Sequence, residues 1–580
     1  MNITKKLKLT VLLVGLLVAF NSCADLSVEN PNAPDRERAL SNPADLVSLL
    51  QGATTDAFQA SLDLWGVHMN GLSDQMTSTN KYLSFWDFTE EPRLRLNNKT
   101  TYADADIFDS PWSTFNASIS SANQIIGIVE GDGKSIVLEN GTDVTQKMLA
   151  SAYFIRGFSR GYIAMIYDQG YIVNYDTDVS QTLDPVPYTD LANAAVEDMD
   201  KAIQTADAVG SNFAWNLLPS GSGVNLSLAQ FKTVVNSFAA RILASTPRTA
   251  SEANSWDWDR VISYAEKGVG GPNAAAAMED FSAVSIANQF YNNLADWSCY
   301  MLGDGSGYLP SDIKIIHMLD NSYPVVYPDA PTVLDSTDVN TNDPRIGYYN
   351  YTPNFGYLSA SRNRNLFSNY LNLRLFSENQ MYNTDGYPMT FFIKAETQYI
   401  LAEAYLMKGN KPMAAQFLMA SPYGNGQTDV TPDMPSVQLG YLGEDGMSGG
   451  NSINGTDSDA AFVRALHREY SVELDLIDGI GLQWFFMRRH DLLQEGTALE
   501  YAIPGSELEI TGREYYSFGG MGYSSDPGTA SGSNSWKTFA PAKSKNKTTY
   551  DAGYHSKTLT PEQLNLNNSL QGGKYRRNRN

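Results

Sequence analysis

Apolar residues recur at steps of three and four in ten segments of this 580-residue chain. That spacing puts them on one face of an α-helix, so each segment predicts an amphipathic helix. Most of the segments come as neighbours separated by a short polar or glycine-containing break, which favours helix pairs. The predicted helices span residues 45–64, 112–130, 147–167, 189–209, 228–245, 258–268, 389–408, 412–420, 460–477 and 482–494.

Long stretches without sustained periodicity separate these helices. They are dense in Asn, Asp, Gly, Pro, Tyr and Trp, and the longest lie at about 69–111, 270–387 and 421–454. Loops of that length are uncommon inside a compact domain and are usually functional or mobile. We therefore expect one body over residues 45–580, in which irregular inserts pack on a helical scaffold. A chain of several separate domains is the alternative that length alone favours.

One helix pair carries a partial repeat signature of the tetratricopeptide type. Small residues at two matching positions let two helices approach closely, while a tyrosine fills the seam between them. The signature tryptophan is replaced by Gln398. A mainly α-helical scaffold of divergent repeats is predicted, with a plain α-helical bundle as the alternative. The matching residues are Leu401, Ala402, Tyr405, Gly409, Ala414 and Leu418.

The first 23 residues have the composition of a bacterial export leader. Three lysines precede an apolar run over residues 9–20, and Cys23 closes the segment. The run is too short to span a bilayer, which takes about 20 apolar residues, but it suits a signal peptide. Residues 20–23, Phe-Asn-Ser-Cys, resemble a lipobox, which implies cleavage before Cys23 and diacylation of its sulfur. An ordinary secretory signal with an incidental cysteine is the alternative.

This leader sets the expected boundaries at the N-terminus. Residues 1–22 are predicted to be a signal peptide, and residues 23–44 a lipid-anchored linker. Pro31 and Pro34 keep that linker out of helical conformation. Once Cys23 is acylated, Cys299 has no cysteine to pair with, so no intrachain disulfide is expected and stability must come from the core.

The charge of the chain narrows the choice of partners. It has 64 Asp and Glu against 41 Lys and Arg, a net charge of −23, which loss of the three leader lysines would take to −26. An acidic surface repels phosphate backbones, so nucleic acid is not expected as a partner. Acidic polysaccharides are disfavoured for the same reason.

Several segments, taken in order, resemble the SusD/RagB family of outer-membrane lipoproteins. The resemblance follows the lipobox and covers most of the chain. Departures fall on scaffold positions: the order of Arg468 and Glu469 is reversed, Asp478 stands for Glu, and Gln483 stands where Arg is common. The matching segments are 26–32, 152–168, 190–203, 239–241, 258–268, 394–406, 468–479, 484–492 and 504–508.

This resemblance implies four tetratricopeptide-like helix pairs that cradle a large irregular subdomain. It also implies a place and a partner: the outer membrane, facing the cell exterior, and a TonB-dependent SusC-like barrel that carries bulky nutrients inward. Relatives capture oligosaccharides or peptides. We expect a neutral oligosaccharide as the ligand. A peptide-capturing, RagB-like lid is the alternative, as is, from another class, a surface glycoside hydrolase.

The residues themselves predict no catalytic centre. The five histidines form no His-Glu-x-x-His zinc motif. Residues 446–450 match the Gly-x-Ser-x-Gly elbow, but they lie in a Gly/Asp loop without the strand and helix that the elbow needs. Neighbouring acids, at residues 90–91 and 104–109, are expected by chance among 64.

No cofactor is predicted either. Asp338, Asn340 and Asn342 begin like a calcium loop. The segment lacks the glycine and the closing glutamate of that motif, so structural calcium stays open without support.

Two irregular stretches combine aromatic rings with Asp, Asn and Arg, as a sugar site requires. Aromatic rings pack on the apolar faces of sugars, and the polar groups bind their hydroxyls. For each aromatic residue the alternative is core packing, since large rings are usually mostly buried; Trp258 and Trp484, on predicted helices, are assigned to the core. The candidate ligand-binding residues are Tyr82, Trp86, Asp87, Arg93, Asn97, Trp297, Tyr300 and Tyr308.

Overall fold

The computed structural model describes residues 42–217, 224–278, 280–283, 309–320, 323–327, 343–351, 366–372, 389–420, 453–475 and 481–538, together with 339, 341 and 359. The chain divides into two compact units, Met1–Ser48 and Leu49–Asn580. In the first unit the described part is Asn42 and the start of helix α3. Cys23 and most of the predicted linker lie outside the described residues, and the predicted boundaries at the N-terminus stay predictions. All contacts reported below lie within the second unit.

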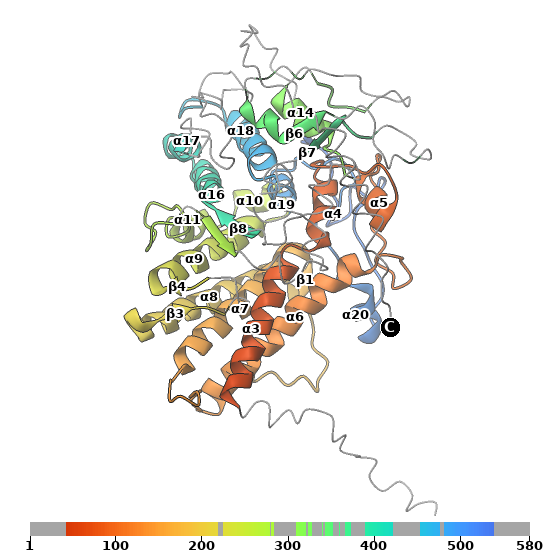
Figure 1. Cartoon of the computed structure of the whole chain (residues 1–580). Helices are drawn as coiled ribbons and strands as arrows, with labels where there is room; N and C mark the ends of the chain where they lie inside the picture. The colour runs from red at the N-terminus through yellow and green to blue at the C-terminus, as the bar shows by residue number, and fades with distance from the viewer. Residues whose placement is uncertain are drawn as a thin grey trace, which may run out of the picture. The chain divides into compact units, whose positions relative to one another are not determined.

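The described part of the second unit is mainly α-helical, as the sequence predicts (Figure 1). In the described part of the chain, four tetratricopeptide-like helix pairs follow one another, and a fifth pair completes the scaffold. The pairs are α3 (Pro43–Ala60) with α6 (Asp106–Ile126), α7 (Thr145–Ile166) with α8 (Tyr188–Val209), α9 (Leu228–Ser245) with α11 (Trp258–Ala265), α16 (Lys394–Met407) with α17 (Lys411–Ala420), and α18 (Asp459–Val472) with α19 (Leu482–Arg489).

Shorter elements connect and cover these pairs. The helices are α4 (Leu64–Leu72), η1 (Tyr82–Ser84), α5 (Phe85–Thr89), the π-helix η2 (Gly127–Gly131), η3 (Gly210–Asn212), α10 (Ala250–Asn254), α14 (Ile313–Leu319), η4 (Pro344–Tyr348), α20 (Gly505–Ile510) and η5 (Trp536–Thr538). The strands form two-stranded antiparallel sheets: β1 (Gln169–Gly170) with β2 (Val186–Pro187), β3 (Ala214–Trp215) with β4 (Leu226–Ser227), β5 (Asp280–Ala283) with β8 (Met389–Ile393), and β6 (Tyr349–Tyr351) with β7 (Tyr370–Asn372).

The pair α16 and α17 confirms the repeat signature. Ala402 and Ala414 are completely buried, which lets the two helices pack closely. Tyr405 fills the seam by stacking on Phe417, with ring centroids 5.4 Å apart and planes 4° apart. Gly409 takes a φ of +75° at the turn, a conformation that costs glycine little. The spacing of small and aromatic residues therefore predicted the packing correctly.

The prediction of a helix from residue 389 is wrong at its start. Residues 389–393 form strand β8, which pairs with β5 so that Phe392 faces Phe281. Phe391, Phe392 and Ile393 are all buried. Aromatic and β-branched residues in an unbroken buried run suit a strand, and the apolar spacing of the following helix continues through them. The helix begins at Lys394.

The first irregular stretch is more helical than predicted. Helix α5 lies within residues 69–111, and α6 begins at Asp106 and runs through Pro111. Proline in the second turn removes one backbone hydrogen bond. The burial of Ile107, Phe108 and Trp112 on one face compensates for that loss, so Pro111 does not mark the end of the irregular stretch.

Buried ion pairs connect the helix pairs. Arg241 of α9 donates to Glu396 of α16, with Nε 2.7 Å from Oε1, and both side chains are buried. Arg489 of α19 donates to Glu403, which also lies on α16, with Nε 2.6 Å from Oε1. Trp258 and Trp484 are also buried, which confirms their assignment to the core.

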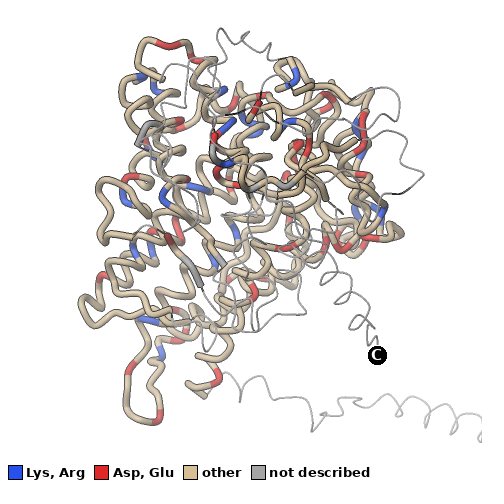
Figure 2. The backbone as a smooth tube through the Cα atoms, turned by 45° about the horizontal axis from the view of Figure 1, so that its top comes forward, with Lys and Arg blue, Asp and Glu red and all other residues tan. Residues whose placement is uncertain are grey.

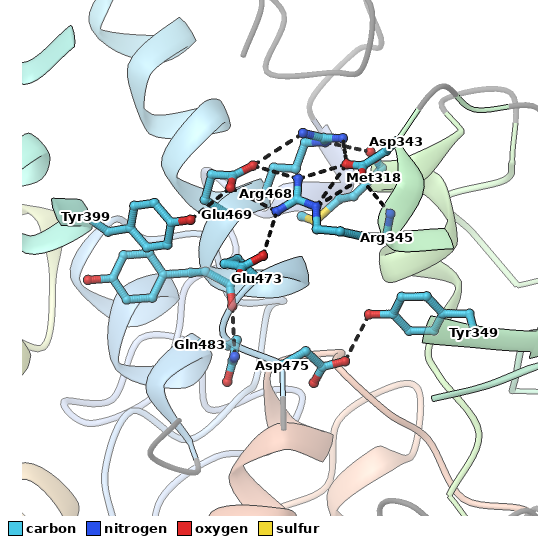
Figure 3. Close-up of polar contacts among 11 residues, drawn as sticks. Met318, Asp343, Arg345, Tyr349, Tyr399, Arg468, Glu469, Glu473, Asp475 and Gln483 are labelled. Carbon is cyan, nitrogen blue, oxygen red and sulfur yellow. Dashed lines mark hydrogen bonds and ion pairs between the residues drawn. The ribbon is translucent and has the colours of Figure 1, made fainter. Parts of the chain in front are cut away.

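A further buried cluster holds part of the second irregular insert against α18 (Figure 3). Arg345 of η4 donates to both oxygens of Glu469, at 2.9 Å each, and to Asp343. Arg468 pairs with the same Asp343, and Tyr349 donates to Asp475 at 3.0 Å. Residues 343–349 of the second irregular insert are thus packed on the helical scaffold, as the sequence predicts.

Charges of both signs are interspersed along the described backbone (Figure 2). Several of the arginines are buried in the pairs just described. None of the helices in the described part combines the length and the apolar composition that a bilayer crossing requires.

Candidate functional site

The first group of predicted ligand residues lies on η1 and α5. Tyr82 is exposed, whereas Trp86 is 8% exposed and has the Lys81 ammonium 4.8 Å from its ring centre. Asp87 is half-buried and accepts a hydrogen bond from the Tyr102 hydroxyl at 2.7 Å. A ligand therefore reaches Tyr82 and the edge of Asp87 more readily than Trp86.

The backbone that presents Tyr82 is unusual. Leu83 and Ser84, the next two residues, both have left-handed φ angles, of +48° and +54°, which non-glycine residues rarely adopt. The buried side chain of His68 supports this turn, with Nε2 2.8 Å from the carbonyl oxygen of Leu83 and its ring stacked on Phe85. Burial lowers the pKa of His68.

Of the remaining predicted residues, the structure describes Arg93 and Asn97. Arg93 is buried and pairs with Asp74, so its guanidinium has its partners inside the protein. Asn97 is exposed, and its side chain accepts a hydrogen bond from the backbone of Lys99 at 3.3 Å. Trp297, Tyr300 and Tyr308 lie outside the described residues.

A different surface brings apolar and charged side chains together near residues 94 and 95. Leu94, Met521 and Tyr523 are each 45% exposed. Arg95 and Asp526 lie at the same place, with Nη1 3.7 Å from Oδ2. We call these five residues the Tyr523 platform: Leu94, Arg95, Met521, Tyr523 and Asp526.

Backbone hydrogen bonds assemble the platform from two distant parts of the chain. The amide of Met521 donates to the carbonyl of Arg93, and the amide of Leu96 donates to that of Phe518, both at 3.0 Å. Gly520 has a φ of +101°, and a Cβ there would lie 3.0 Å from the Cβ of Arg95. Glycine is required at this close approach.

The guanidinium of Arg95 is fixed over the ring of Tyr523. It lies 4.3 Å from the ring centre and donates from Nε to the Ser517 hydroxyl at 3.1 Å. A second donor nitrogen reaches the Ser517 carbonyl at 2.5 Å. A cation over an aromatic face is stabilised by the ring quadrupole, so this contact and the bonds to Ser517 favour the orientation of Arg95 over Tyr523. The surface offers an exposed ring, a held guanidinium and a carboxylate within one patch.

Sequence reasoning missed the half of this platform that follows residue 518. The available signal was the segment Gly519 to Tyr523, in which Met and Tyr alternate with glycine. Glycines that remove side chains around an aromatic residue favour close approach of a ligand or of another backbone. The sequence alone did not show that this segment pairs with residues 93–96.

Comparison with known proteins identifies the type of fold. No family model and no curated protein sequence matches the chain. Among solved structures, a SusD-like carbohydrate binding protein from Bacteroides fragilis NCTC 9343 matches with a TM-score of 0.50 and 14% identity, over 83% of this chain and 94% of that one. The chain has a SusD-like fold.

Two further SusD-like structures match over similar lengths. A SusD superfamily protein from Parabacteroides distasonis ATCC 8503 is 12% identical, with a TM-score of 0.49, over 83% of this chain and 98% of that one. A SusD-like protein from Bacteroides fragilis NCTC 9343 is 13% identical, with a TM-score of 0.49, over 78% and 86%. At these identities the likeness concerns the fold and not the ligand.

Three of the neighbouring acids singled out in the sequence accept hydrogen bonds from other side chains. Glu91 accepts from Gln494 and Lys537, at 2.7 and 2.6 Å. Asp104 accepts from the Ser84 hydroxyl and Asp109 from that of Ser506. Each of the three carboxylates thus contributes to the local structure.

Metal binding has no geometric support in the same part of the fold. Among the described residues, no three His, Cys, Asp or Glu side chains come together as a metal site requires. Residues 338, 340 and 342, at the partial calcium motif, and residues 446–450, at the partial elbow, lie outside the described residues.

Proposed function

We propose that the protein is a lipid-anchored, outer-membrane nutrient receptor that faces the cell exterior. It captures an oligosaccharide and delivers it to a TonB-dependent SusC-like barrel, and it does not act on the ligand chemically. The lipobox-like segment ending at Cys23 supports the anchor. The SusD-like fold supports a receptor role, because one structure of that fold is described as carbohydrate binding.

The Tyr523 platform is the observation that supports an oligosaccharide as the ligand. The apolar face of a sugar ring packs on an aromatic ring, and its hydroxyl groups bind the guanidinium and carboxylate groups at the rim. Arg95 lies over one face of the Tyr523 ring and Asp526 lies beside Arg95, so the sugar would pack on the opposite face of the ring. Because Arg95 shares its charge with Asp526 and the Ser517 carbonyl, a neutral sugar fits better than an acidic one. Tyr82, Asp87 and Asn97 are proposed as further contacts.

A peptide ligand remains the second candidate because of Leu94 and Met521. Both are apolar, exposed and without hydroxyl-binding groups, and Met is enriched where proteins bind other chains. The binding test therefore includes peptides.

The function is tested by incubating the mature protein with neutral oligosaccharides and with unstructured peptides. We expect it to bind at least one glycan and to return it unchanged, as judged by calorimetry and by chromatography of the recovered sugar. Release of shorter products by the protein alone would establish the hydrolase instead, and binding of peptides without glycans would establish the peptide receptor.

Two further experiments address the anchor and the partner. Cys23→Ala should move the protein from the membrane to the soluble fraction; unchanged fractionation would contradict lipidation. Co-purification with the barrel encoded beside this gene should survive mild detergent, and the absence of such a neighbouring gene would count against the delivery role.

A further inference from the structure

Three chain segments meet beneath the Tyr523 platform. The hydrogen bond from the Met521 amide to the Arg93 carbonyl connects the platform to residue 93. A second hydrogen bond, of 2.7 Å, runs from the Gly520 amide to the Gly496 carbonyl and connects the platform to residue 496. A Cβ at Gly496 would lie 2.9 Å from the Met521 nitrogen, so these backbones are in direct contact. The position of the platform therefore depends on where residues 93 and 496 lie.

One buried carboxylate, that of Asp74, binds both of the segments that contain residues 93 and 496. Asp74 pairs with the guanidinium of Arg93, which precedes Arg95 by two residues. The same carboxylate accepts from the Gln494 amide at 2.7 Å, and Gln494 precedes Gly496 by two residues. It also accepts from the indole nitrogen of Trp536 at 2.6 Å. Asp74 thus joins the segments that carry the two halves of the platform.

The backbone at Asp74 is built for this position. Two residues after the end of α4, Asp74 adopts a φ of +55°, although it is not glycine, and its side chain is 2% exposed. Such a conformation persists where the surrounding structure demands it. Burial would raise the pKa of Asp74, but Arg93, Lys537 and Lys314 outweigh burial and lower it. Asp74 is therefore charged at neutral pH and can accept from its three donors.

We propose that Asp74 is the positioning residue of the Tyr523 platform: it sets the geometry of the ligand surface without touching the ligand. The inference rests on the proposed function in so far as the platform binds the ligand. A charged oxygen acceptor is essential to this role, because Arg93, Gln494 and Trp536 all present N–H groups to it.

The test compares Asp74→Asn with a matched variant, Asp343→Asn. Asp343 is likewise buried and charged, and it pairs with two arginines where Asp74 pairs with one, but it belongs to the cluster on α18. Two readouts are taken for each full-length mature variant: hydrogen exchange of peptides covering residues 518–523, and affinity for a neutral oligosaccharide panel of maltoheptaose, cellohexaose, xylohexaose and mannohexaose. Trp536→Phe, which removes only one donor, is the milder variant should Asp74→Asn not fold.

Asp74→Asn is expected to speed exchange in residues 518–523 about tenfold and to weaken glycan affinity by about the same factor, because a loosened support shell misplaces the site. Asp343→Asn should lower the melting temperature yet change both readouts less than about twofold. Trp536→Phe should shift both in the same direction by a smaller factor.

Equal exchange of residues 518–523 in Asp74→Asn and Asp343→Asn would overturn the inference, as would unchanged exchange in Trp536→Phe if only that variant folds. A different result would contradict the proposed function. If Tyr523→Ala binds every probe like the wild type, the platform is not the ligand site, and exchange alone then decides whether Asp74 positions this segment.

Discussion

Burial separates the aromatic residues of the first irregular stretch into two kinds. Trp86 is 8% exposed and Tyr82 is 42% exposed, although they lie four residues apart in the same aromatic-rich stretch of sequence. Trp86→Ala should therefore lower the free energy of unfolding by about 3–5 kcal/mol, the usual cost of removing a buried tryptophan. Urea unfolding measures this.

Tyr82→Ala is the matched control on the same turn. Its free energy of unfolding should stay within about 0.5 kcal/mol of the wild type, as for most exposed positions. Equal stability of the two variants would show that Trp86 does not belong to the core.

Asp168 makes stability depend on pH. Burial, and next the negative charge of Glu500, raise its pKa from 3.8 to about 7, although the Tyr516 hydroxyl donates to both of its oxygens. The folded pKa lies above the unfolded value, so the stabilising contribution is complete below pH 3.8 and is lost as the pH rises through 7. Asp168→Asn removes this loss.

We expect Asp168→Asn to be more stable than the wild type at pH 8 by about 1–3 kcal/mol, as a shift of this size allows. At pH 4 the two proteins should differ little. Unfolding by urea at several pH values measures the difference, and parallel curves for the two proteins would contradict the assignment.

At the scale of elements, the charged cluster around Arg345 anchors the insert. Burial alone would raise the pKa of Asp343, but Arg345 and Arg468 outweigh it and hold the pKa at about 2. Removing one partner of a buried pair leaves an uncompensated charge, which costs about 3–5 kcal/mol. Arg345→Met should lower the free energy of unfolding by that amount and speed hydrogen exchange in residues 343–351.

Lys134→Met is the control for this prediction. Lys134 and Asp132 form an exposed pair, and such pairs contribute about 0–1 kcal/mol. If the two variants lose the same stability, the cluster does not anchor the insert.

The elements differ in how far sequence alone predicts them. Helix α9 ends at Ser245 as expected, and Ala402, Tyr405 and Ala414 pack as their spacing indicates, because helix periodicity and close packing are local properties. Strand β8 was missed because its register depends on β5, far away in sequence.

The candidate site was harder to predict for the same reason. Sequence composition pointed to residues 82–97, and Leu94 and Arg95 do lie on the platform within that stretch. Composition does not distinguish Arg93, whose guanidinium turns inward to Asp74, from Arg95, whose guanidinium turns outward over Tyr523. That distinction is made by the pairing of residues 93–96 with 518–521, which no local pattern encodes.

At the scale of the whole molecule, the fold and its ligand are separate questions. A SusD-like fold at 14% identity determines how the helix pairs are arranged, and function is decided by the site placed on them. The net charge of −23 opposes acidic ligands at long range, which agrees with a platform whose arginine is already paired.

The most direct measurement is the affinity of the mature protein for the neutral oligosaccharide panel, compared between Tyr523→Ala and Tyr515→Ala. Tyr515 is equally exposed, at 46% against 45%, but it bonds to Glu509 instead of lying under Arg95. Tyr523→Ala should weaken binding by about 1–3 kcal/mol, the contribution of one aromatic stacking platform, with an unchanged melting temperature, whereas Tyr515→Ala should bind like the wild type. Equal affinities of the two variants would contradict a ligand site at Tyr523.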